Sequence, residues 1–334
     1  MDNNERPLKV LVTGAAGFLG SNLVDFLLQK GHSVIGLDNF QSGSSRNLKH
    51  LDNHPRFEFL KSLMHYDELS HSIYSPIPDI EGLDQIYNLA CPASPVHYQK
   101  DPISTLDTCY LGTRNLLELA RSKKIRILQT STSEVYGDPS VHPQPENYWG
   151  NVNPFGPRSC YDEGKRVAEA LCYAYREQHS VDIRIARIFN TYGPRMGAND
   201  GRVVSSFIAS ALAGENLKIT GDGMATRSFQ FVTDCMEGLY ALMNSDYSKG
   251  PVNIGNDGEF TIERLAELVI DLVSRMTSQP RVSISHLPSP LDDPAVRRPD
   301  IALVREVLCW RPVVQLEEGL ERTIQWHINE NLSD

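Results

Sequence analysis

The stretch Thr13–Gly20, TGAAGFLG, decides the fold of this chain. It follows LKVLVT (8–13), whose β-branched residues predict a short strand, and it precedes an amphipathic stretch, 18–30, that predicts a helix. Glycines in such a turn let the backbone bend tightly and approach a pyrophosphate, which the helix N-terminus can hold. A turn that is merely tight would look the same, so the glycines alone leave both interpretations open.

A second apolar run, HSVIGLD (32–38), follows the predicted helix and ends in Asp38, 18 residues after Gly20. A carboxylate at this place can accept hydrogen bonds from both ribose hydroxyls of a dinucleotide, and it repels a 2′-phosphate. Asp38 therefore favours the dinucleotide interpretation, with NAD rather than NADP as the cofactor.

The same strand–helix alternation continues outward to about residue 190. Further strands are predicted at FEFL (57–60), QIYNLA (85–90), RILQTS (126–131) and DIRIARIF (182–189), with helices at 102–123 and 161–178. This order is typical of a Rossmann-type, doubly wound parallel sheet of the α/β class. We expect an NAD-binding domain over 1–190, which also receives segments near 229–258.

The second part of the chain is richer in turns and predicts helices near 202–213, 233–244, 261–275 and 316–330. We expect a smaller, interleaved α+β substrate domain over 191–334. The boundary near residue 190 is approximate, because turn-rich segments alternate with helices on its far side.

Composition narrows the classes of partner. The 334 residues include 32 Lys and Arg against 42 Asp and Glu, a net charge of −10, which argues against nucleic acid or an anionic membrane surface. Six scattered cysteines form no C-x-x-C pair, and no metal site is expected. The chain also shows no signal-peptide pattern and no long apolar run, so we expect a cytoplasmic enzyme.

Tyr161 and Lys165 lie four residues apart on a predicted helix and so share one face. A nearby ammonium group favours tyrosinate and lowers the phenol pKa from about 10 toward neutrality, which suits the tyrosine to move a hydroxyl proton during hydride transfer. An ordinary surface pair would have the same spacing.

Hydroxyl side chains cluster in QTSTSEVYG (129–137), where the strand predicted at 126–131 ends. Parallel sheets place ligands at the carboxyl ends of their strands, so Thr132 could share the reacting proton with Tyr161. Capping of a helix or turn is the other explanation for such a cluster.

Several longer motifs carry a family resemblance. These motifs are TGAAGFLG (13–20), STSEVYGDPSVHPQPENYWGNVNP (131–154), CYDEGKRVAEA (160–170), ARIFNTYGPR (186–195), DGRVVSSFI (200–208) and DDPAVRRPDI (292–301). With them the chain resembles the UDP-glucuronate decarboxylases, or UDP-xylose synthases, of the extended short-chain dehydrogenase/reductase superfamily over about residues 7–328.

The resemblance implies conversion of UDP-glucuronate to UDP-xylose and CO₂ with NAD⁺ retained. Oxidation at C4 of the sugar creates a β-keto acid, whose ketone accepts the electrons that CO₂ leaves behind, and the hydride is then returned. Three alternatives stay open: a UDP-glucuronate 4-epimerase, a UDP-apiose/UDP-xylose synthase, and a sugar-nucleotide-binding protein without catalysis.

Catalytic roles follow from the same resemblance. Tyr161 would be the C4 base, Thr132 its hydrogen-bonding partner, and Lys165 would tune the tyrosine and hold the nicotinamide ribose. Glu134 and Ser133 would orient the sugar carboxyl group or a water molecule. Related dehydratases carry an Asp-Glu pair there, and serine cannot replace its acid.

The remaining ligand contacts implied by the resemblance fall into two sets. The cofactor set is Gly14, Gly17, Phe18, Leu19, Gly20, Asp38, Asn39, Phe40, Ser42, Gly43, Leu89, Cys91, Thr108, Thr130, Tyr161, Lys165 and Thr191. The substrate set is Asn115, Arg158, Tyr175, Asn190, Arg202, Arg227 and Arg297. Arg297 is expected near the sugar carboxylate or the developing enolate, with Arg158 as a second candidate. Surface ion pairing is the alternative role of these two arginines.

Three positions depart from the family pattern. Leu63 stands where an Asp that contacts adenine is expected, and Asp67 could replace it. Asp107 stands where a Lys is expected, and Cys109 stands where an Asn is expected. The resemblance also implies a homodimer in which the helices predicted at 102–123 and 161–178 pair between subunits.

Overall fold

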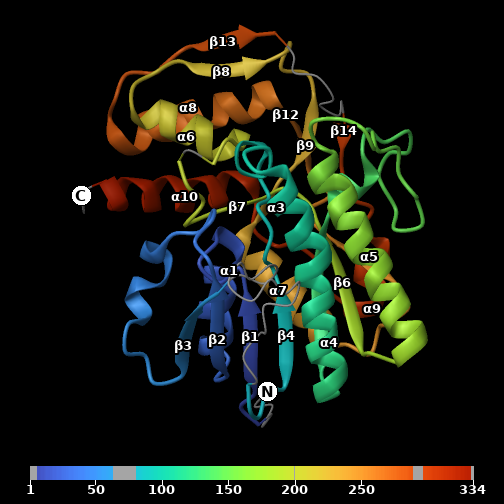
Figure 1. Ribbon diagram of the computed structural model, residues 1–334. Coiled ribbons are helices and arrows are strands. Elements are labelled where there is room, and N and C mark those ends of the chain that lie inside the picture. The colour runs from blue at the N-terminus through green and yellow to red at the C-terminus, as the bar shows by residue number, and fades with distance from the viewer. Residues whose placement is uncertain (1–5, 63–79, 199, 289–295, 332–334) are drawn as a thin grey trace.

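A seven-stranded, wholly parallel sheet forms the centre of the molecule (Figure 1). The computed structural model describes residues 6–62, 80–198, 200–288 and 296–331. In sheet order the strands are β11 (Pro251–Ile254), β6 (Ile183–Ile188), β5 (Arg126–Thr132), β4 (Gln85–Asn88), β1 (Lys9–Thr13), β2 (Ser33–Asp38) and β3 (Phe57–Lys61). The predicted doubly wound parallel sheet is confirmed.

Burial on both faces explains why the central strands are apolar almost without interruption. Val10, Leu11 and Val12 of β1 are fully buried, because helices cover the sheet on both sides. The strand order reverses between β1 and β4: the chain adds β2 and β3 on one side of β1, and it adds β5 and β6 on the far side of β4. A crevice opens at such a switch point, at the carboxyl ends of the strands.

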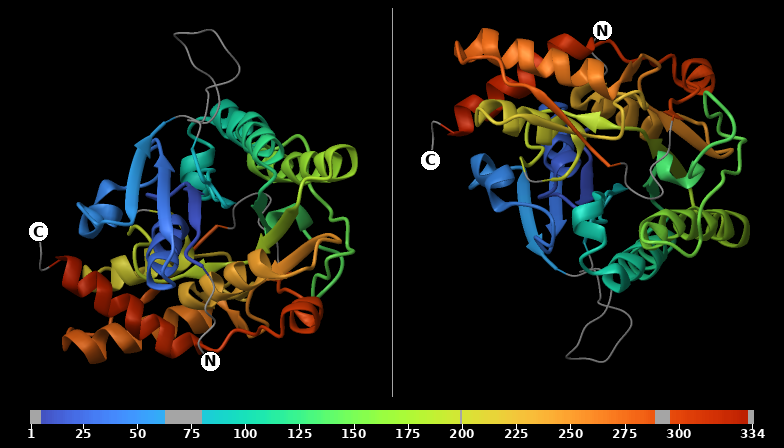
Figure 2. Two further views of the ribbon diagram at one scale, coloured as in Figure 1. Left: turned by 90° about the horizontal axis from the view of Figure 1, so that it is seen from below. Right: turned by 90° about the horizontal axis from the view of Figure 1, so that it is seen from above.

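Helices cover both faces of the sheet (Figure 2). Helices α1 (Phe18–Gln29) and α7 (Val232–Asn244) contribute to the larger apolar cluster. On the opposite face, α4 (Thr113–Lys123) and α5 (Ser159–His179) contribute to a second cluster. The two clusters together clamp the strands and so fix the position of the crevice.

The predicted helix 102–123 is not one regular helix. The structure divides it into α3 (Pro102–Asp107), a π-helical turn, η2 (Thr108–Gly112), and α4. A π turn inserts one extra residue into the helical spiral and often marks a functional site. The single-helix prediction is wrong in this detail, and the turn places Thr108 and Cys109 beside the crevice.

Much of the second part of the chain lies over the carboxyl ends of the sheet strands (Figure 1), whereas its β11 and α7 belong to the sheet and to the layer packed on it. Its helices are α6 (Val203–Leu212), α8 (Ile262–Thr277), α9 (Ala302–Leu308) and α10 (Leu316–Asn331). Small sheets join β8 (Leu217–Thr220) to β13 (Ile284–Leu287), β9 (Thr226–Ser228) to β12 (Glu259–Thr261) and β14 (Val296–Arg297), and β7 (Thr191–Tyr192) to β10 (Gln230–Phe231). Within the described ranges, no helix is both long and apolar enough to cross a lipid bilayer.

Candidate active site

The glycine turn between β1 and α1 has no room for side chains. Gly14 has φ +70°, and a Cβ there would lie 2.8 Å from the carbonyl carbon of Leu89. A Cβ at Gly20 would lie 1.9 Å from the Gly14 carbonyl oxygen. Gly17, the N-cap of α1, gives no side-chain cap to the helix. The first turn of α1 therefore presents backbone N–H groups, as a pyrophosphate site requires.

Asp38 lies at the end of β2 beside this turn. Its carboxylate accepts hydrogen bonds from the backbone N–H groups of Ala16, at 2.9 Å, and Phe40, at 2.7 Å. Burial raises the pKa of the Asp38 carboxyl, and those backbone hydrogen bonds oppose the shift. The two bonds fix the carboxylate at the mouth of a small cavity, in the place predicted for a ribose-binding acid.

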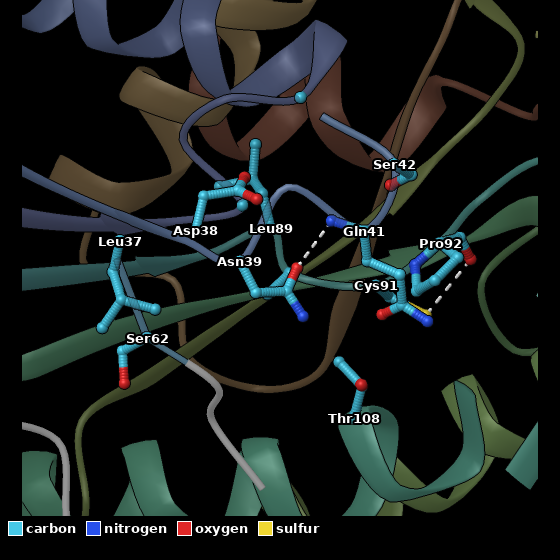
Figure 3. A pocket seen from close by; sticks show the side chains of 13 residues that line it. Leu37, Asp38, Asn39, Gln41, Ser42, Ser62, Leu89, Cys91, Pro92 and Thr108 are labelled. Carbon is cyan, nitrogen blue, oxygen red and sulfur yellow. Dashed lines mark hydrogen bonds between the residues drawn. The ribbon is translucent and has the colours of Figure 1, made fainter. Parts of the chain in front are cut away.

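Figure 3 shows this cavity, which we call the cofactor cavity. Residues after β2 form one side, and residues after β4 together with the π turn form the other. Its wall is made by Gly14, Gly17, Leu37, Asp38, Asn39, Gln41, Ser42, Ser62, Leu89, Ala90, Cys91, Pro92 and Thr108. A glycine cradle joined to a fixed carboxylate fits an NAD molecule, and eight residues of the predicted cofactor set, Gly14, Gly17, Asp38, Asn39, Ser42, Leu89, Cys91 and Thr108, lie in this wall.

The other predicted cofactor residues lie around this cavity or in the next one. Phe18, Leu19 and Gly20 begin α1. The Phe40 ring packs at a tilt against that of Phe59, with the ring centroids 5.2 Å apart. Gly43 packs against Ala16, because a Cβ at Gly43 would lie 2.8 Å from the Ala16 carbonyl carbon. Leu63 and Asp67 lie outside the described residues.

A larger cavity, of about 420 Å³, adjoins the first and shares Leu89 and Cys91 with it. Sheet residues of the first half meet α6, β8 and β9 of the second half across it. It brings together most of the predicted catalytic and ligand residues: Leu19, Thr130, Thr132, Ser133, Glu134, Arg158, Tyr161, Lys165, Asn190, Thr191, Arg202 and Arg227.

Tyr161 and Lys165 point to this cavity from the first two turns of α5. Tyr161 is 6% exposed, hydrogen-bonds Thr132 and stacks on Tyr98 with ring centroids 5.0 Å apart. Lys165 Nζ donates to the Thr130 carbonyl at 3.0 Å and lies 5.8 Å from the Tyr161 ring centroid. The predicted triad of Tyr161, Lys165 and Thr132 is therefore assembled in space.

The pKa of the Tyr161 phenol shifts in the direction opposite to the one predicted from the sequence. Burial raises the pKa of the Tyr161 phenol well above its ordinary value, and the hydrogen bond with Thr132 only partly opposes this shift. Lys165 keeps its positive charge and donates to the Thr130 carbonyl, but burial outweighs the predicted lowering of the Tyr161 pKa toward neutrality, which is wrong for this arrangement. A positive charge added to the cavity would shift the phenol the other way.

Glu134 sits in a buried ion network beside Tyr161. Arg297 binds both of its carboxylate oxygens, at 2.5 and 2.8 Å, and Arg158 binds one of them at 2.8 Å. Burial alone would raise the pKa of the Glu134 carboxyl, but the charges of Arg297 and Arg158 outweigh it and hold the pKa below its ordinary value. Glu134 is therefore ionised, and it is an acceptor rather than a proton donor.

The network changes the role expected of Arg297. Arg297 is 5% exposed, lies on β14 and is not in the cavity wall, whereas Glu134 and Arg158 are. Its guanidinium group binds Glu134, so the structure shows a contact with Glu134 in place of the predicted contact with the sugar carboxylate. Of the two predicted arginines, only Arg158 reaches the cavity.

Asp162, which the sequence analysis did not single out, lies beside this network. Burial, and then the nearby Glu134 charge, raise the pKa of its carboxyl to about 7. One of its carboxylate oxygens, Oδ1, is buried without a hydrogen-bond partner within the described residues. In the sequence, the signal that could have indicated Asp162 was its position directly after Tyr161.

Cations also line the large cavity. Arg202 precedes α6 and pairs with Asp200 at 3.0 Å, and Arg227 of β9 is buried and donates to the Thr226 carbonyl. Asn190 stands between β6 and β7 in the same wall. Lys218 of β8 also lies there and was missed, although the exposed alternate positions of LKIT could have indicated it.

Two predicted substrate residues lie elsewhere. Tyr175 is 14 residues beyond Tyr161 on α5, a rise of about 21 Å along the helix, and its hydroxyl donates to Glu118 at 2.5 Å. Asn115 of α4 is in neither cavity wall, and neither is Asp107 at the end of α3. The structure therefore does not support Tyr175 and Asn115 as UDP contacts, nor Asp107 as a charge facing the ligand.

Comparison with known proteins gives a consistent picture. The family model described as GDP-mannose 4,6 dehydratase matches residues 11–323. UDP-glucuronic acid decarboxylase 6 of Arabidopsis thaliana is 54% identical over 94% of this chain and 87% of its own length. UDP-glucuronic acid decarboxylase 1 of Danio rerio is 52% identical over 96% of this chain and 73% of its own length.

The fold comparison adds a ligand-bound relative. The structure of UDP-glucuronic acid 4-epimerase from Bacillus cereus, in complex with UDP-glucuronic acid and NAD, is 28% identical. It superimposes with a TM-score of 0.82 and covers 97% of this chain and all of that one.

Proposed function

The chain belongs to the UDP-glucuronic acid decarboxylases of the extended short-chain dehydrogenase/reductase superfamily, and on that premise we propose that it converts UDP-glucuronate to UDP-xylose and CO₂. One observation carries the proposal: Tyr161, Thr132 and Lys165 lie in one cavity wall with an ionised Glu134 and the neutral Ser133. This set can move a proton at C4 of a sugar, but it lacks the acid that water loss requires.

NAD, when bound, supplies the oxidation of C4 and its later reduction. Gly14, Gly17 and Asp38 would hold it, since the cradle at the start of α1 and the carboxylate after β2 fit a dinucleotide. The same residues favour NAD over NADP, because a 2′-phosphate would face the Asp38 carboxylate.

Tyr161 takes the C4 hydroxyl proton and later gives it back. Thr132 holds the phenol oxygen by its hydrogen bond, and Lys165 contributes a positive charge nearby. A carboxylate attached to C5 is lost as CO₂ once C4 is a ketone, because that ketone accepts the remaining electron pair as an enolate. C5 then takes a proton from water, which restores the ketone before the hydride returns to C4. Ser133 and Glu134 orient the sugar end that carries the carboxylate, and the burial of Tyr161 keeps bulk water from the phenol.

The UDP moiety would lie toward Arg202, Arg227 and Lys218. Arginine binds phosphate oxygens through two parallel hydrogen bonds, and lysine adds a point charge. These residues come from α6, β8 and β9, so the second part of the chain would supply the substrate end of the cavity and residues 1–190 the cofactor end.

Incubation of the purified protein with UDP-glucuronate and NAD tests the proposal. Proton NMR should show a UDP-pentose, and CO₂ should appear in equal amount. UDP-galacturonate without CO₂ would instead identify an epimerase, and binding without turnover would identify a protein without catalysis.

We also propose a homodimer in the cytoplasm. The outer side of α3, η2 and α5 exposes Ile103, Tyr110 and Tyr173, apolar side chains that a pairing of these helices between subunits would cover. The cytoplasmic location rests on the scattered cysteines of the sequence, which form no disulfide framework. Sedimentation analysis at micromolar concentration should give a mass twice the 37.4 kDa of the chain. A species with the mass of one chain would contradict the dimer.

A further inference from the structure

Two cysteines lie in contact where the two cavities meet. Cys91 follows β4, and Cys109 belongs to the π turn η2, 18 residues later. Their sulfur atoms are 3.3 Å apart. Of the other four cysteines, Cys160 and Cys172 lie on α5, Cys235 lies on α7, and Cys309 follows α9. The pair is therefore a distinct chemical feature of this chain.

The pair touches both functional parts of the molecule. Cys91 lies in the wall of the cofactor cavity and of the large cavity, and its thiol donates to the Pro92 carbonyl at 3.3 Å (Figure 3). Cys109 is 2% exposed and packs on α5 at Gly164, where a Cβ would lie 3.0 Å from its sulfur. Gly164 directly precedes Lys165. One sulfur is therefore open to a small molecule in the cavities, and its partner lies behind it.

We propose that Cys91 and Cys109 form a reversible disulfide by exchange with a low-molecular-weight disulfide such as oxidised glutathione. A Cys91 thiolate attacks one sulfur of the small disulfide, which releases one small thiol and leaves a mixed disulfide on Cys91. Cys109, as thiolate, then attacks the Cys91 sulfur and releases the second small thiol. The protein loses two protons and two electrons in all, and the small disulfide is reduced to two thiols.

The electrostatics assign the two steps to the two cysteines. The hydrogen bond with Cys91 lowers the pKa of the Cys109 thiol against the effect of burial, and the Lys165 charge lowers it further. Cys109 is therefore suited to the second, resolving step. The same contact, together with burial, raises the pKa of the Cys91 thiol, so the first exchange is the slow one and quickens at higher pH.

Closure of the bond must move the walls of both cavities. A disulfide holds its sulfurs about 2.05 Å apart, so the two atoms must approach from 3.3 Å. Cys91 is a wall residue of the cofactor cavity, and Cys109 is packed on the helix that carries Tyr161 and Lys165. We expect oxidation to weaken NAD binding and, resting on the proposed function, to suppress turnover.

The experiment treats the reduced full-length protein with oxidised glutathione at pH 8 and maps its peptides without reduction. We expect a Cys91–Cys109 linkage, loss of two free thiols, and reversal of both by dithiothreitol. Saturating NAD should slow the linkage at least about tenfold, because it covers Cys91. The turnover rate should fall in parallel with the linkage and return with it.

Matched variants separate this site from the other thiols. Cys109→Ala should stop at a mixed disulfide on Cys91, whereas Cys309→Ser, which removes an exposed thiol, should still form the linkage. Glutathione found only on Cys309 in the wild-type protein, or a linkage rate unaffected by NAD, would overturn the proposal. Peptide mapping does not depend on turnover. A protein that has no decarboxylase activity when reduced, yet forms the linkage on oxidation, would contradict the proposed function and not the disulfide.

Discussion

Tyr161 is the residue on which the chemistry depends. Replacing it by Phe removes the phenol oxygen and keeps the ring that stacks on Tyr98. The decarboxylation rate should fall by roughly 10²–10⁴, the usual contribution of a positioned acid–base group. Steady-state CO₂ release measures this rate directly.

Tyr173 provides the matched control, because it lies on the same helix with its side chain 61% exposed. Tyr173→Phe should keep the wild-type rate. If Tyr161→Phe retained more than about a tenth of the rate, the base role of Tyr161 would be lost.

Arg297 acts through Glu134 and is a positioning residue. Arg297→Ala leaves a buried carboxylate with Arg158 as its remaining ion-pair partner and should cost about 3–5 kcal/mol of unfolding free energy. Without the Arg297 charge the pKa of Glu134 rises, so activity that needs the ionised carboxylate should be lost at a higher pH than in the wild-type protein. Urea unfolding and a pH–rate profile check the two effects.

Arg298 is the control for this change, since it is the next residue and pairs with Glu259 at 3.6 Å. Arg298→Ala should leave the acid limb of the pH–rate profile in place. Arg297→Lys should recover part of the shift, because it restores the charge without the two-point contact. An unmoved acid limb in Arg297→Ala would show that the arginine is structural only.

At the scale of elements, the glycine turn is the most constrained segment. Gly20→Ala places a methyl group 1.9 Å from the Gly14 carbonyl oxygen, and backbone must move to relieve the overlap. The turn at the start of α1 would open, and NAD affinity should fall at least about tenfold, or about 1.4 kcal/mol. Calorimetric titration with NAD measures the change.

Gly250→Ala serves as its control, because a Cβ at Gly250 would meet no atom within 4 Å. Its NAD affinity should equal that of the wild-type protein. An unchanged affinity in Gly20→Ala would remove the turn from the cofactor site.

The same scale shows what sequence patterns can and cannot predict. The run HSVIGLD and the other β-branched runs predicted six of the seven sheet strands, because buried parallel strands are apolar almost throughout. Strand β11 comes from the second half, and Pro251 and Asn253 interrupt its apolar run, so its pattern is weak. The π turn at Thr108–Gly112 leaves no periodic signal, because it changes one hydrogen-bonded turn without changing the residue types.

The site shows a similar division. Tyr161, Lys165 and Thr132 could be placed together from spacing and from the strand end, because helix and sheet periodicity fix both. The pairing of Arg297 with Glu134 joins residues 163 positions apart, and only the folded chain reveals it. Tyr175 was misplaced because the resemblance gave no measure of the distance along α5.

At the scale of the whole molecule, net charge is a poor guide to the ligand. The chain carries −10, yet Arg158, Arg202, Arg227 and Lys218 all line the large cavity. The positive field is local, produced where the second part of the chain closes over the sheet. An anionic sugar nucleotide is therefore compatible with an acidic protein.

Lys218→Ala tests this view, because it removes one cavity cation and leaves the catalytic residues in place. The KM for UDP-glucuronate should rise about 3- to 30-fold with little change in kcat, as expected for loss of uniform substrate binding. Lys249→Ala, a lysine of the turn before β11 that lies in neither cavity wall, is the control. An unchanged KM in Lys218→Ala would place the UDP moiety elsewhere.

The central claim is that the sugar of UDP-glucuronate is oxidised at C4 only transiently, and that the electrons return to the same carbon. UDP-glucuronate deuterated at C4 tests it in ordinary water, with NMR and mass spectrometry of the product. We expect UDP-xylose that keeps its deuterium at C4, released with one CO₂ per turnover. Loss of that deuterium to solvent, or a product that still carries the carboxylate, would contradict the account.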